Sequence, residues 1–548
     1  MISQIGPGIY ENFRFLLAEV ISQVGYLRTT CDSGSLHIAM KILDRSGYPD
    51  NLKMRIRDGC TLALKKRKGA VTRAQSIKAV ESVAIDLDRI SRLCRHCVRQ
   101  LNAAERATKY VKRRHARMLS YVEEGLGIVG DAAENTEISA ILKLANLNEK
   151  IGREYARVLT KCKADLKKAD DMEPIIAAIF LAQRIEDMGD ALQDIGDAFI
   201  SANMGQQLSA ESYRSLAASV DNLPVEDNSV KFEVQTLAQT RSGSQISGIS
   251  EAGADTDSYI AVFKDGKRRK LKEERNKVNV WNAVFPGLAP KVLGYHKNDQ
   301  SASLLLEHLP GQTLEQILIS ESTETFDDAL KQLKKTLRAV WKKTHEKTSG
   351  PAGFMDQLSG RMDAICELHQ EFRDDGRKIA GREVLSFESL IAACRAREKR
   401  LKSSYTVRIH GDFNLDNILY DPASQAIRFI DLHRSQNMDF VQDVSVFMVS
   451  LYRLQALEAA HRRRVYYAAS EFYDFARDFA RRSEDRTFEL RLALGLARSF
   501  ATSTRFILDK SLAGNMYLRA RFLLEQVHVS PARKPEQFVV PVKELFIG

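Results

Sequence analysis

Hydrophobic residues recur at helical spacing from about residue 8 to about residue 205, in long amphipathic runs that contain few prolines. This region divides into halves at about 8–110 and about 115–205, and each half suggests three helices. The final helix of each half carries a charged cluster, at 86–90 and at 184–190. The pattern therefore predicts an all-α region built from tandem three-helix bundles.

The pattern changes near residue 229, where short strand-like runs replace the long helical ones. Beyond residue 312 the spacing is mostly helical again, except around 407–431. The sequence thus predicts a small β-rich lobe followed by a large helical lobe, which together make an α+β domain. In the small lobe, strands are predicted at 230–234, 259–264 and 303–307, with a loop at 242–249 and a hairpin turn at Asp265-Gly266.

These changes predict a multidomain chain. The all-helical domain covers 1–207, a polar linker that contains Pro224 covers 208–228, and the α+β domain covers 229–548. Within the last domain, the small lobe is expected at about 229–310 and the large lobe at about 311–548. A length of 548 residues accommodates roughly two to four domains, so the division agrees with the size of the chain.

The charge balance gives no reason to expect nucleic acid binding. The net charge is +11, which is modest for this length, and the basic residues are scattered. The N-terminus lacks the features of a signal peptide, and no stretch is apolar enough to span a bilayer. Seven cysteines in so long a chain do not form a disulfide framework, so we expect a cytoplasmic protein with reduced thiols.

One cysteine pair, in Cys94-Arg95-His96-Cys97, has the spacing of half a zinc site. No second pair supplies the remaining ligands. The same cysteines also belong to an apolar helical stripe, which consists of Val83, Leu87, Ile90, Cys94, Cys97 and Leu101. We therefore expect both cysteines to be thiols of a hydrophobic core.

The strongest chemical signal is the run His410-Gly411-Asp412-Phe413-Asn414-Leu415-Asp416-Asn417. Phosphoryl transfer requires positioning and charge neutralisation more than covalent participation of the protein. Asn417 follows Asp412 at the spacing of the kinase catalytic loop H-R-D-x-x-x-x-N. Asp412 is therefore the candidate catalytic base and Asn417 a candidate Mg²⁺ ligand. Asp431, at the end of the strand-like run Phe429-Ile430-Asp431, is the second candidate ligand.

Two further residues follow the order of kinase sequences. Lys264 lies on an early predicted strand, after the glycine-containing segment 242–248, where a phosphate-binding lysine is expected. Glu274 opens the next helix and is the candidate partner of Lys264, with its neighbour Glu273 as the alternative.

On these residues, the region from about 229 to about 535 resembles the aminoglycoside phosphotransferase and choline kinase family, which shares the protein-kinase fold. The segments 290–294 and 307–311 also match. The resemblance implies ATP or GTP as the donor and Mg²⁺ as cofactor. It further implies that the backbone near Glu307 and Leu309 contacts the nucleotide base, and that Asp443 braces the catalytic loop.

This sequence departs from the family pattern at two places. Leu432 stands where an aromatic residue is frequent, and Asn437-Met438-Asp439 replaces a Gly-Asp-Pro motif. Both departures affect the assignment of the substrate more than that of the chemistry.

The helical region resembles the PhoU-type domain, a regulator of phosphate uptake and signalling. That family carries Glu/Asp-x-x-x-Asp in the third helix of each bundle and binds metal there. Glu186 and Asp190 match the motif in the second half, whereas Arg92 replaces the second acid after Asp88 in the first. The alternative is that this acidic helix face is simply solvated.

Three functions are compatible with these features. The first is a phosphotransferase that uses ATP or GTP and Mg²⁺ to move the γ-phosphoryl group to a hydroxyl of a small molecule. The second is a phosphate-signalling regulator or scaffold whose kinase-like domain only binds nucleotide. The presence of Asp412, Asn417 and Asp431 together favours the first. A protein kinase is disfavoured, because no activation segment follows Asp431.

The sequence says less about the acceptor and about protein partners. Arginines of the large lobe favour an anionic or phosphorylated acceptor over a polycationic one; they are Arg462 to Arg464, Arg481, Arg482, Arg519 and Arg521. The PhoU-like domain is expected, by analogy, to bind a protein partner or a second copy of itself.

Overall fold

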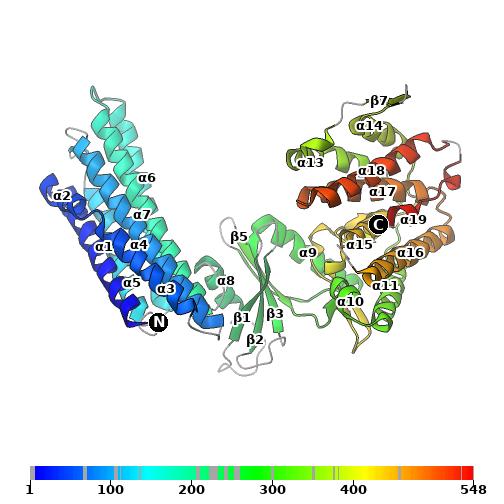
Figure 1. The fold of residues 1–548 in the computed structure, drawn as a ribbon, viewed down its shortest axis with the longest axis horizontal. Coiled ribbons are helices and arrows are strands. Elements are labelled where there is room, and N and C mark those ends of the chain that lie inside the picture. Colours follow the sequence, from blue (N-terminus) through cyan, green and yellow to red (C-terminus); the bar gives the residue numbers. More distant parts are fainter. Residues whose placement is uncertain are drawn as a thin grey trace. The chain divides into compact units, whose positions relative to one another are not determined.

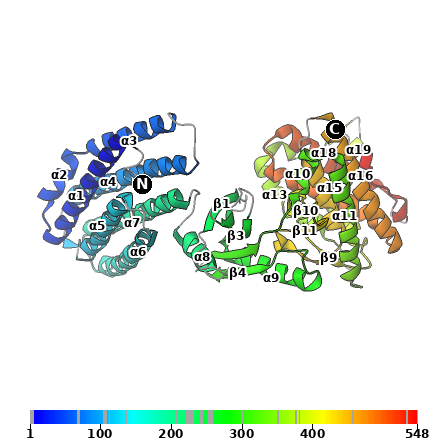
Figure 2. The same cartoon turned by 90° about the horizontal axis from the view of Figure 1, so that it is seen from below.

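The chain forms two compact units, Met1–Gly266 and Lys267–Gly548. Figures 1 and 2 show the fold from two sides. The computed structural model describes residues 6–65, 71–103, 109–111, 113–134, 138–204, 210–220, 232–239, 245–251, 259–297, 301–348, 352–373, 377–379, 382–454, 458–531 and 534–546.

Long helices that lie side by side dominate the first unit (Figure 1). The predicted helical region is thereby confirmed. The helices of the first half are α1 (Pro7–Ser33), α2 (Leu36–Asp44), α3 (Tyr48–Lys65) and α4 (Val71–Ala103). Those of the second half are α5 (Arg113–Glu134), α6 (Ile138–Leu166) and α7 (Glu173–Met204), and α7 packs along α4.

The first half has four helices among its described residues, where the sequence predicts three. The chain leaves helical geometry at Arg45, which caps α2, and α3 begins at Tyr48. Pro49 follows in the first turn of α3. Proline has no N–H to donate within a helix and is tolerated in the first turn, so one predicted helix becomes two.

The apolar stripe around the cysteine pair faces the interior of the bundle. Cys94 and Cys97 are fully buried, whereas His96 between them is exposed. Burial raises the pKa of the Cys94 thiol to about 12, so this thiol stays protonated at neutral pH. Both cysteines are core thiols, as the helical spacing predicts.

Three strands complete the first unit. They are β1 (Phe232–Gln239), β2 (Gln245–Glu251) and β3 (Tyr259–Lys267), and they pair consecutively in antiparallel orientation. The segment predicted as a loop at 242–249 is therefore a strand from Gln245 onward, and residues 242–244 lie outside the described part. The reason is tertiary, because Gly248 pairs with both neighbouring strands.

The hairpin turn predicted at Asp265-Gly266 is also wrong. Strand β3 continues through Lys267, and the helix α9 (Arg268–Val284) follows directly. Asp265 is held in the strand by its pairing with Gln245, and its carboxyl accepts a hydrogen bond from Ser212. Ser212 belongs to the helix α8 (Ala210–Val220), which lies within the predicted linker at 208–228.

The second unit combines short strands with many helices (Figure 2). Its strands are β4 (Val292–Lys297), β5 (Ser301–Glu307), β6 (Gln312–Thr313), β7 (Arg377–Ile379), β8 (Arg382–Val384), β9 (Val407–Ile409), β10 (Ile418–Asp421), β11 (Ala426–Phe429) and β12 (Gln436–Met438). Its α-helices after α9 are α10 (Leu314–Ser320), α11 (Thr323–Lys343), α12 (Phe354–Ser359), α13 (Met362–Leu368), α14 (Phe387–Glu398), α15 (Val441–Arg453), α16 (Ala459–Arg482), α17 (Phe488–Ser503), α18 (Lys510–Val529) and α19 (Val542–Phe546). Its 3₁₀ turns are η3 (Gln370–Phe372), η4 (Leu415–Asn417), η5 (Leu432–Arg434), η6 (Thr504–Phe506) and η7 (Pro535–Gln537). A helical region followed by a mixed α/β region confirms the predicted fold class.

Short sheets in this unit hold the segment that carries the predicted chemistry. Strand β10 lies between β11 and β6, and β9 pairs with β12. The helix α9 is fastened to the same region, because the Trp281 indole donates to Ser435 Oγ at 2.7 Å. Ser435 Oγ in turn donates to the Ile409 carbonyl oxygen at 2.7 Å, which ties the end of β9 to the start of β12.

The core of the large lobe is rich in aromatic side chains and contains one buried ion-pair group. The ring of Trp341 lies 4.9 Å from that of Phe440 and 5.4 Å from that of Phe475, measured between centroids. Arg491 of α17 is fully buried and donates to the carboxylates of Asp439 and Asp485. Asp439 precedes Phe440, so the ion pair and the aromatic cluster fix the same stretch of chain.

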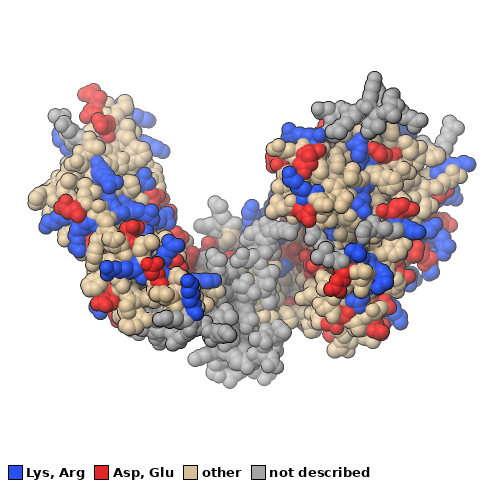
Figure 3. All heavy atoms as spheres, viewed as in Figure 1, with Lys and Arg blue, Asp and Glu red and all other residues tan. Residues whose placement is uncertain are grey.

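The surface shows no broad region of one charge on the face drawn in Figure 3, where acidic and basic side chains are interspersed. Among the described helices, none combines the length and the apolar character needed to cross a membrane.

Candidate active site

The predicted catalytic loop begins where strand β9 ends. The His410 side chain is buried, and its Nε2 lies 2.9 Å from the Ile430 carbonyl oxygen. Ile430 immediately precedes Asp431, and its N–H donates to the Asn417 carbonyl oxygen at 3.0 Å. The loop and the end of β11 are therefore connected at both ends of the 410–417 run.

Asp443 holds the start of this loop from α15. Its carboxylate accepts hydrogen bonds from the backbone N–H groups of His410 at 2.7 Å and Gly411 at 2.8 Å. Burial raises the pKa of Asp443 to about 7, although these two donors act in the opposite direction. These two hydrogen bonds from the loop backbone to Asp443 correspond to the bracing role that the family resemblance implies.

Asp412 presents its carboxylate at the edge of the loop. The carboxylate is 21% exposed, and its Oδ2 lies 3.5 Å from a guanidinium nitrogen of Arg434. The other oxygen accepts a hydrogen bond from Asn414 Nδ2 at 2.9 Å. A carboxylate held in this way can still accept a proton from a bound hydroxyl group.

Asn417 hydrogen-bonds to the backbone of Asp412, and Asp431 follows Ile430, whose N–H donates to Asn417. Asn417 Nδ2 donates to the Asp412 carbonyl oxygen at 2.8 Å, which leaves its amide oxygen as the atom that can meet a cation. Asp431 has the positive φ of 59°, which is uncommon for a residue other than glycine. Its Oδ1 lies 3.0 Å from His433 Nδ1.

This pair of oxygen donors fits Mg²⁺. The ion prefers oxygen ligands and keeps several waters, so one or two protein ligands are usual. Among the described residues, no group of three or more His, Cys, Asp or Glu side chains could hold a metal. The candidate pair of Asn417 and Asp431 is smaller than such a group. This is expected for a metal ion whose other ligands come from a bound nucleotide.

Three of the predicted site residues are therefore brought together: Asp412, Asn417 and Asp431. The others are placed separately. Lys264 is buried on β3 of the first unit, and Glu274 is buried on α9 of the second. Their mutual pairing stays a prediction.

The predicted hinge follows strand β5. The Glu307 N–H donates to the Lys291 carbonyl oxygen at 2.9 Å, and Glu307 Oε2 accepts from the Lys291 N–H at 3.0 Å. Leu309 is buried. The contact of Glu307 and Leu309 with a nucleotide base stays a prediction.

The acidic residues of the helical unit are also occupied by protein contacts. Glu186 accepts a hydrogen bond from Gln183 at 2.8 Å, and Asp190 accepts one from Asn148 at 3.2 Å. In the first half, Asp88 is buried and paired with Lys53 at 2.9 Å and Arg92 at 3.4 Å. The second metal site at Glu186 and Asp190 stays a prediction.

Five of the arginines that suggested an anionic acceptor contact other parts of the protein. Arg464 donates to the carbonyl oxygens of Leu318 and Glu321, each at 2.8 Å. Arg481 and Arg482 both pair with Asp478. Arg519 and Arg521 donate to the Leu545 and Leu385 carbonyl oxygens. The anionic acceptor stays a prediction, because composition alone cannot distinguish an arginine that fastens a helix from one that binds a ligand.

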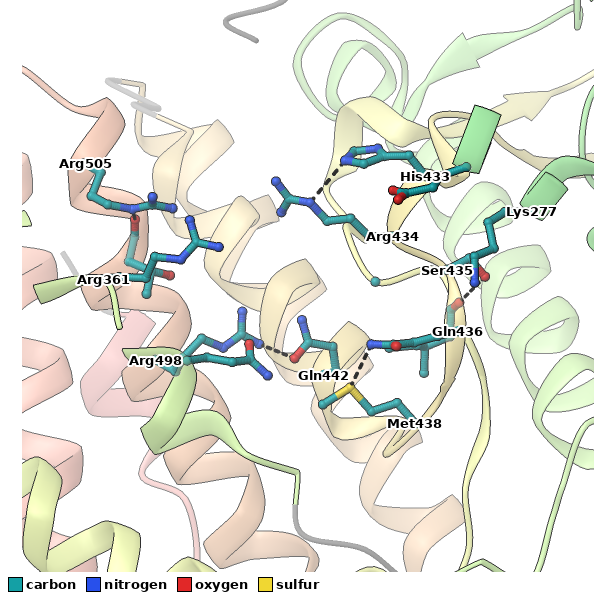
Figure 4. Close-up of a pocket in the computed structure, with 15 residues that line it drawn as sticks. Lys277, Arg361, His433, Arg434, Ser435, Gln436, Met438, Gln442, Arg498 and Arg505 are labelled. Carbon is teal, nitrogen blue, oxygen red and sulfur yellow. Dashed lines mark hydrogen bonds between the residues drawn. The ribbon is translucent and has the colours of Figure 1, made fainter. Parts of the chain in front are cut away.

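A different set of basic residues lies at the site (Figure 4). A cavity of about 680 Å³ is lined by Gly411 of the loop together with Arg361, Arg434, Arg498 and Arg505. Arg434 had a sequence signal, because it follows Asp431 within three residues. The other three had none, since they come from α17 and the turns at the ends of other helices.

Gly411 provides a sensitive test of the loop geometry. Its φ is 86°, and a Cβ there would lie 2.4 Å from the Arg434 carbonyl oxygen. We expect Gly411→Ala to cost about 1–3 kcal/mol from backbone strain alone, and to displace Asp412 enough to lower turnover at least tenfold. Gly514→Ala is the control, because a Cβ there meets nothing within 4 Å. Turnover by Gly411→Ala equal to that of the control would contradict this account.

Comparison with known proteins gives one family match, in the second part of the chain. Residues 260–482 match the phosphotransferase enzyme family. This match confirms the resemblance predicted for that part of the chain and supports a small-molecule phosphotransferase. No curated protein matches the chain.

Several solved structures are similar at low identity. PhoU from Pseudomonas aeruginosa is 16% identical, with 38% of this chain and 100% of that chain covered and a TM-score of 0.35. An aminoglycoside-3'-phosphotransferase of type VIII is 19% identical, with 54% and 99% covered and a TM-score of 0.33. A putative fructosamine-3-kinase from Haemophilus somnus 129PT is 12% identical, with 57% and 97% covered and a TM-score of 0.35.

Proposed function

We propose that this protein transfers the γ-phosphoryl group of ATP or GTP to a hydroxyl group of a small molecule, with Mg²⁺ as cofactor. The observation that carries the proposal is that backbone hydrogen bonds connect the segment of Asp412 and Asn417 to the strand end that precedes Asp431. Asn417 Nδ2 donates to the Asp412 carbonyl oxygen, and the N–H of Ile430, which precedes Asp431, donates to the Asn417 carbonyl oxygen. Each of the three side chains has the chemistry that its proposed role requires.

Asp412 would act as the catalytic base that receives the proton of the acceptor hydroxyl. The Asn417 amide oxygen and the Asp431 carboxylate would hold Mg²⁺, which supplies charge neutralisation for the phosphates when it is bound. Lys264 would contact the phosphates, with Glu274 holding it in place, and the backbone near Glu307 and Leu309 would contact the base.

The short connection after Asp431 supports a small acceptor over a protein. The 3₁₀ turn η5 and strand β12 follow at once, and α15 begins at Val441. All residues between Asp431 and Val441 are described, and they leave no room for a long activation segment that would bind a peptide. The cavity of about 680 Å³ beside the loop has a size typical of small-molecule sites.

The test is a Mg²⁺ titration of phosphoryl transfer by the full chain. We expect Asn417→Ala to raise the Mg²⁺ concentration at half-maximal rate by about 10–100-fold, the range in which weakened metal sites fall. Excess Mg²⁺ should partly restore the rate. The matched control is Asn515→Ala on the exposed face of α18, which should titrate like the wild type. An unchanged Mg²⁺ dependence in Asn417→Ala would reject the assigned ligand.

A further inference from the structure

The cavity beside the catalytic loop carries an excess of positive charge. Its described lining residues include four arginines and Lys277, and Glu273 is the one carboxylate among them. Figure 4 shows the guanidinium groups of Arg361, Arg434, Arg498 and Arg505 turned toward a common space. Like charges gathered in this way repel one another unless an anion lies between them.

Arg498 is the most informative of these residues. Its side chain is only 7% exposed, and its Nη2 donates to Gln442 Oε1 at 2.8 Å and to Ser445 Oγ at 3.3 Å. Its Nε has no hydrogen-bond partner, and no carboxylate of the described residues forms an ion pair with it. The carboxylates of Asp412, Asp443 and Glu398 attract its charge, but none lies within ion-pair distance. Burying a cation in this way is costly, so a bound anion would compensate it.

Arg505 and Arg361 approach the same space from two other elements. The Arg505 guanidinium donates to the Thr502 carbonyl oxygen at 3.0 Å and lies over the Phe506 ring. Burial lowers the pKa of Arg505, and the nearby charges of Arg361 and Arg434 lower it further. The guanidinium groups of Arg361 and Arg434 are therefore close enough to Arg505 for their charges to lower its pKa. Arginines that were far apart and freely solvated would not have this effect.

The position of this group favours the acceptor over the nucleotide. A second, smaller cavity of about 90 Å³ is lined by Asp412 and Asn414, and it shares Gly411, Arg434, Arg498 and Arg505 with the larger one. Neither Asn417 nor Asp431 lines either cavity. The arginines thus line the cavity that reaches Asp412, where the attacking hydroxyl must be, whereas the proposed metal ligands line neither cavity.

We infer that the acceptor is a hydroxyl compound that already carries a phosphoryl group, and that Arg361, Arg434, Arg498 and Arg505 bind this group. The inference rests on the proposed function and specifies its substrate class. Several guanidinium groups match a phosphate dianion, which accepts paired N–H donors, better than they match a single carboxylate. Polycationic acceptors would be repelled.

The reaction then converts a monophosphate into a compound with two phosphoryl groups. The acceptor hydroxyl oxygen forms a bond to the γ-phosphorus as the bond between that phosphorus and the β–γ bridging oxygen breaks. The hydroxyl proton passes to Asp412, and the nucleoside diphosphate leaves with the bridging oxygen.

Calorimetric binding to the full chain without nucleotide tests this inference. The probes are ribose 5-phosphate and glycerol 3-phosphate against ribose and glycerol, with inorganic phosphate alone and gluconate as further arms. We expect the phosphorylated probes and inorganic phosphate to bind, and the neutral sugars and gluconate to bind at least tenfold more weakly. Arg361→Gln and Arg505→Gln should each weaken phosphate binding about tenfold, the factor expected for loss of one charge-assisted contact.

Arg463→Gln is the matched control, because Arg463 is exposed on α16 and lines neither cavity. The Arg361 and Arg505 variants are preferred over Arg498 variants because their side chains are less buried, and the fold depends less on them. Equal binding of phosphorylated and neutral probes, or binding of phosphate that neither variant changes, would overturn the inference. Variants that weaken nucleotide binding but not binding of the probes would also overturn it.

The proposed function is tested separately in the same preparation. Transfer of phosphate to a neutral or cationic hydroxyl compound at wild-type rate in both arginine variants would leave the phosphotransferase in place and reject the anionic acceptor. Phosphate binding that depends on Arg361 and Arg505, in a protein without Asp412-dependent turnover, would keep the anion site and reject the phosphotransferase.

Discussion

Turnover of nucleotide with any acceptor should fall by at least ~10²–10⁴ in Asp412→Asn, the range in which general acid–base catalysis contributes. Asparagine has the shape of aspartate and can keep the hydrogen bond from Asn414 Nδ2. It cannot accept a proton at neutral pH, and it loses the attraction of the Arg434 guanidinium. The loss should therefore appear in kcat, with little change in nucleotide affinity.

The measurement is steady-state phosphoryl transfer together with nucleotide binding to the same variant. Asp474→Asn, on an exposed position of α16, is the matched control and should behave like the wild type. Asp412→Asn with wild-type kcat would show that this carboxylate is not the base. Tight nucleotide binding by a wild-type protein without turnover on any acceptor would instead favour the regulatory function.

The second large effect is expected on stability. Arg491→Met should destabilise the second unit by about 3–5 kcal/mol, the usual cost of removing one partner from a buried ion pair. Arg491 is fully buried, and the side chains of both its partners, Asp439 and Asp485, are 2% exposed. Methionine fills a similar volume, so the loss reflects two carboxylates left without a counter-ion more than a cavity.

Tryptophan fluorescence during urea unfolding can measure this effect in the full chain. Trp281 and Trp341 are the two tryptophans of the sequence, and both are buried in the second unit. The matched control is Arg482→Met, whose exposed pair with Asp478 should contribute little to stability because solvent screens it. Equal midpoints for Arg491→Met and Arg482→Met would contradict the expected role.

The sequence determined the local parts of this protein. Helical spacing is a property of consecutive residues, so the long helices of the first unit and the burial of Cys94 and Cys97 followed from it directly. The catalytic-loop run is equally local, since Asp412 and Asn417 are joined within one short segment. Asp431 could be added because a carboxylate at a strand end follows the loop in kinase order.

Tertiary structure decided everything that depends on residues distant in the chain. Residues from Gln245 form a strand, against the local pattern, because two neighbouring strands supply backbone partners. Asp439 was only a departure from a family motif until the fold placed Arg491 beside it. Arg498 and Arg505 likewise have no sequence signal, whereas Arg464, Arg519 and Arg521, which the sequence offered, donate to backbone carbonyl oxygens. Whether an arginine binds a ligand depends on its surroundings. Its burial and its distance from carboxylates set the electrostatic free energy of the guanidinium group. Neither quantity can be read from the order of residues along the chain.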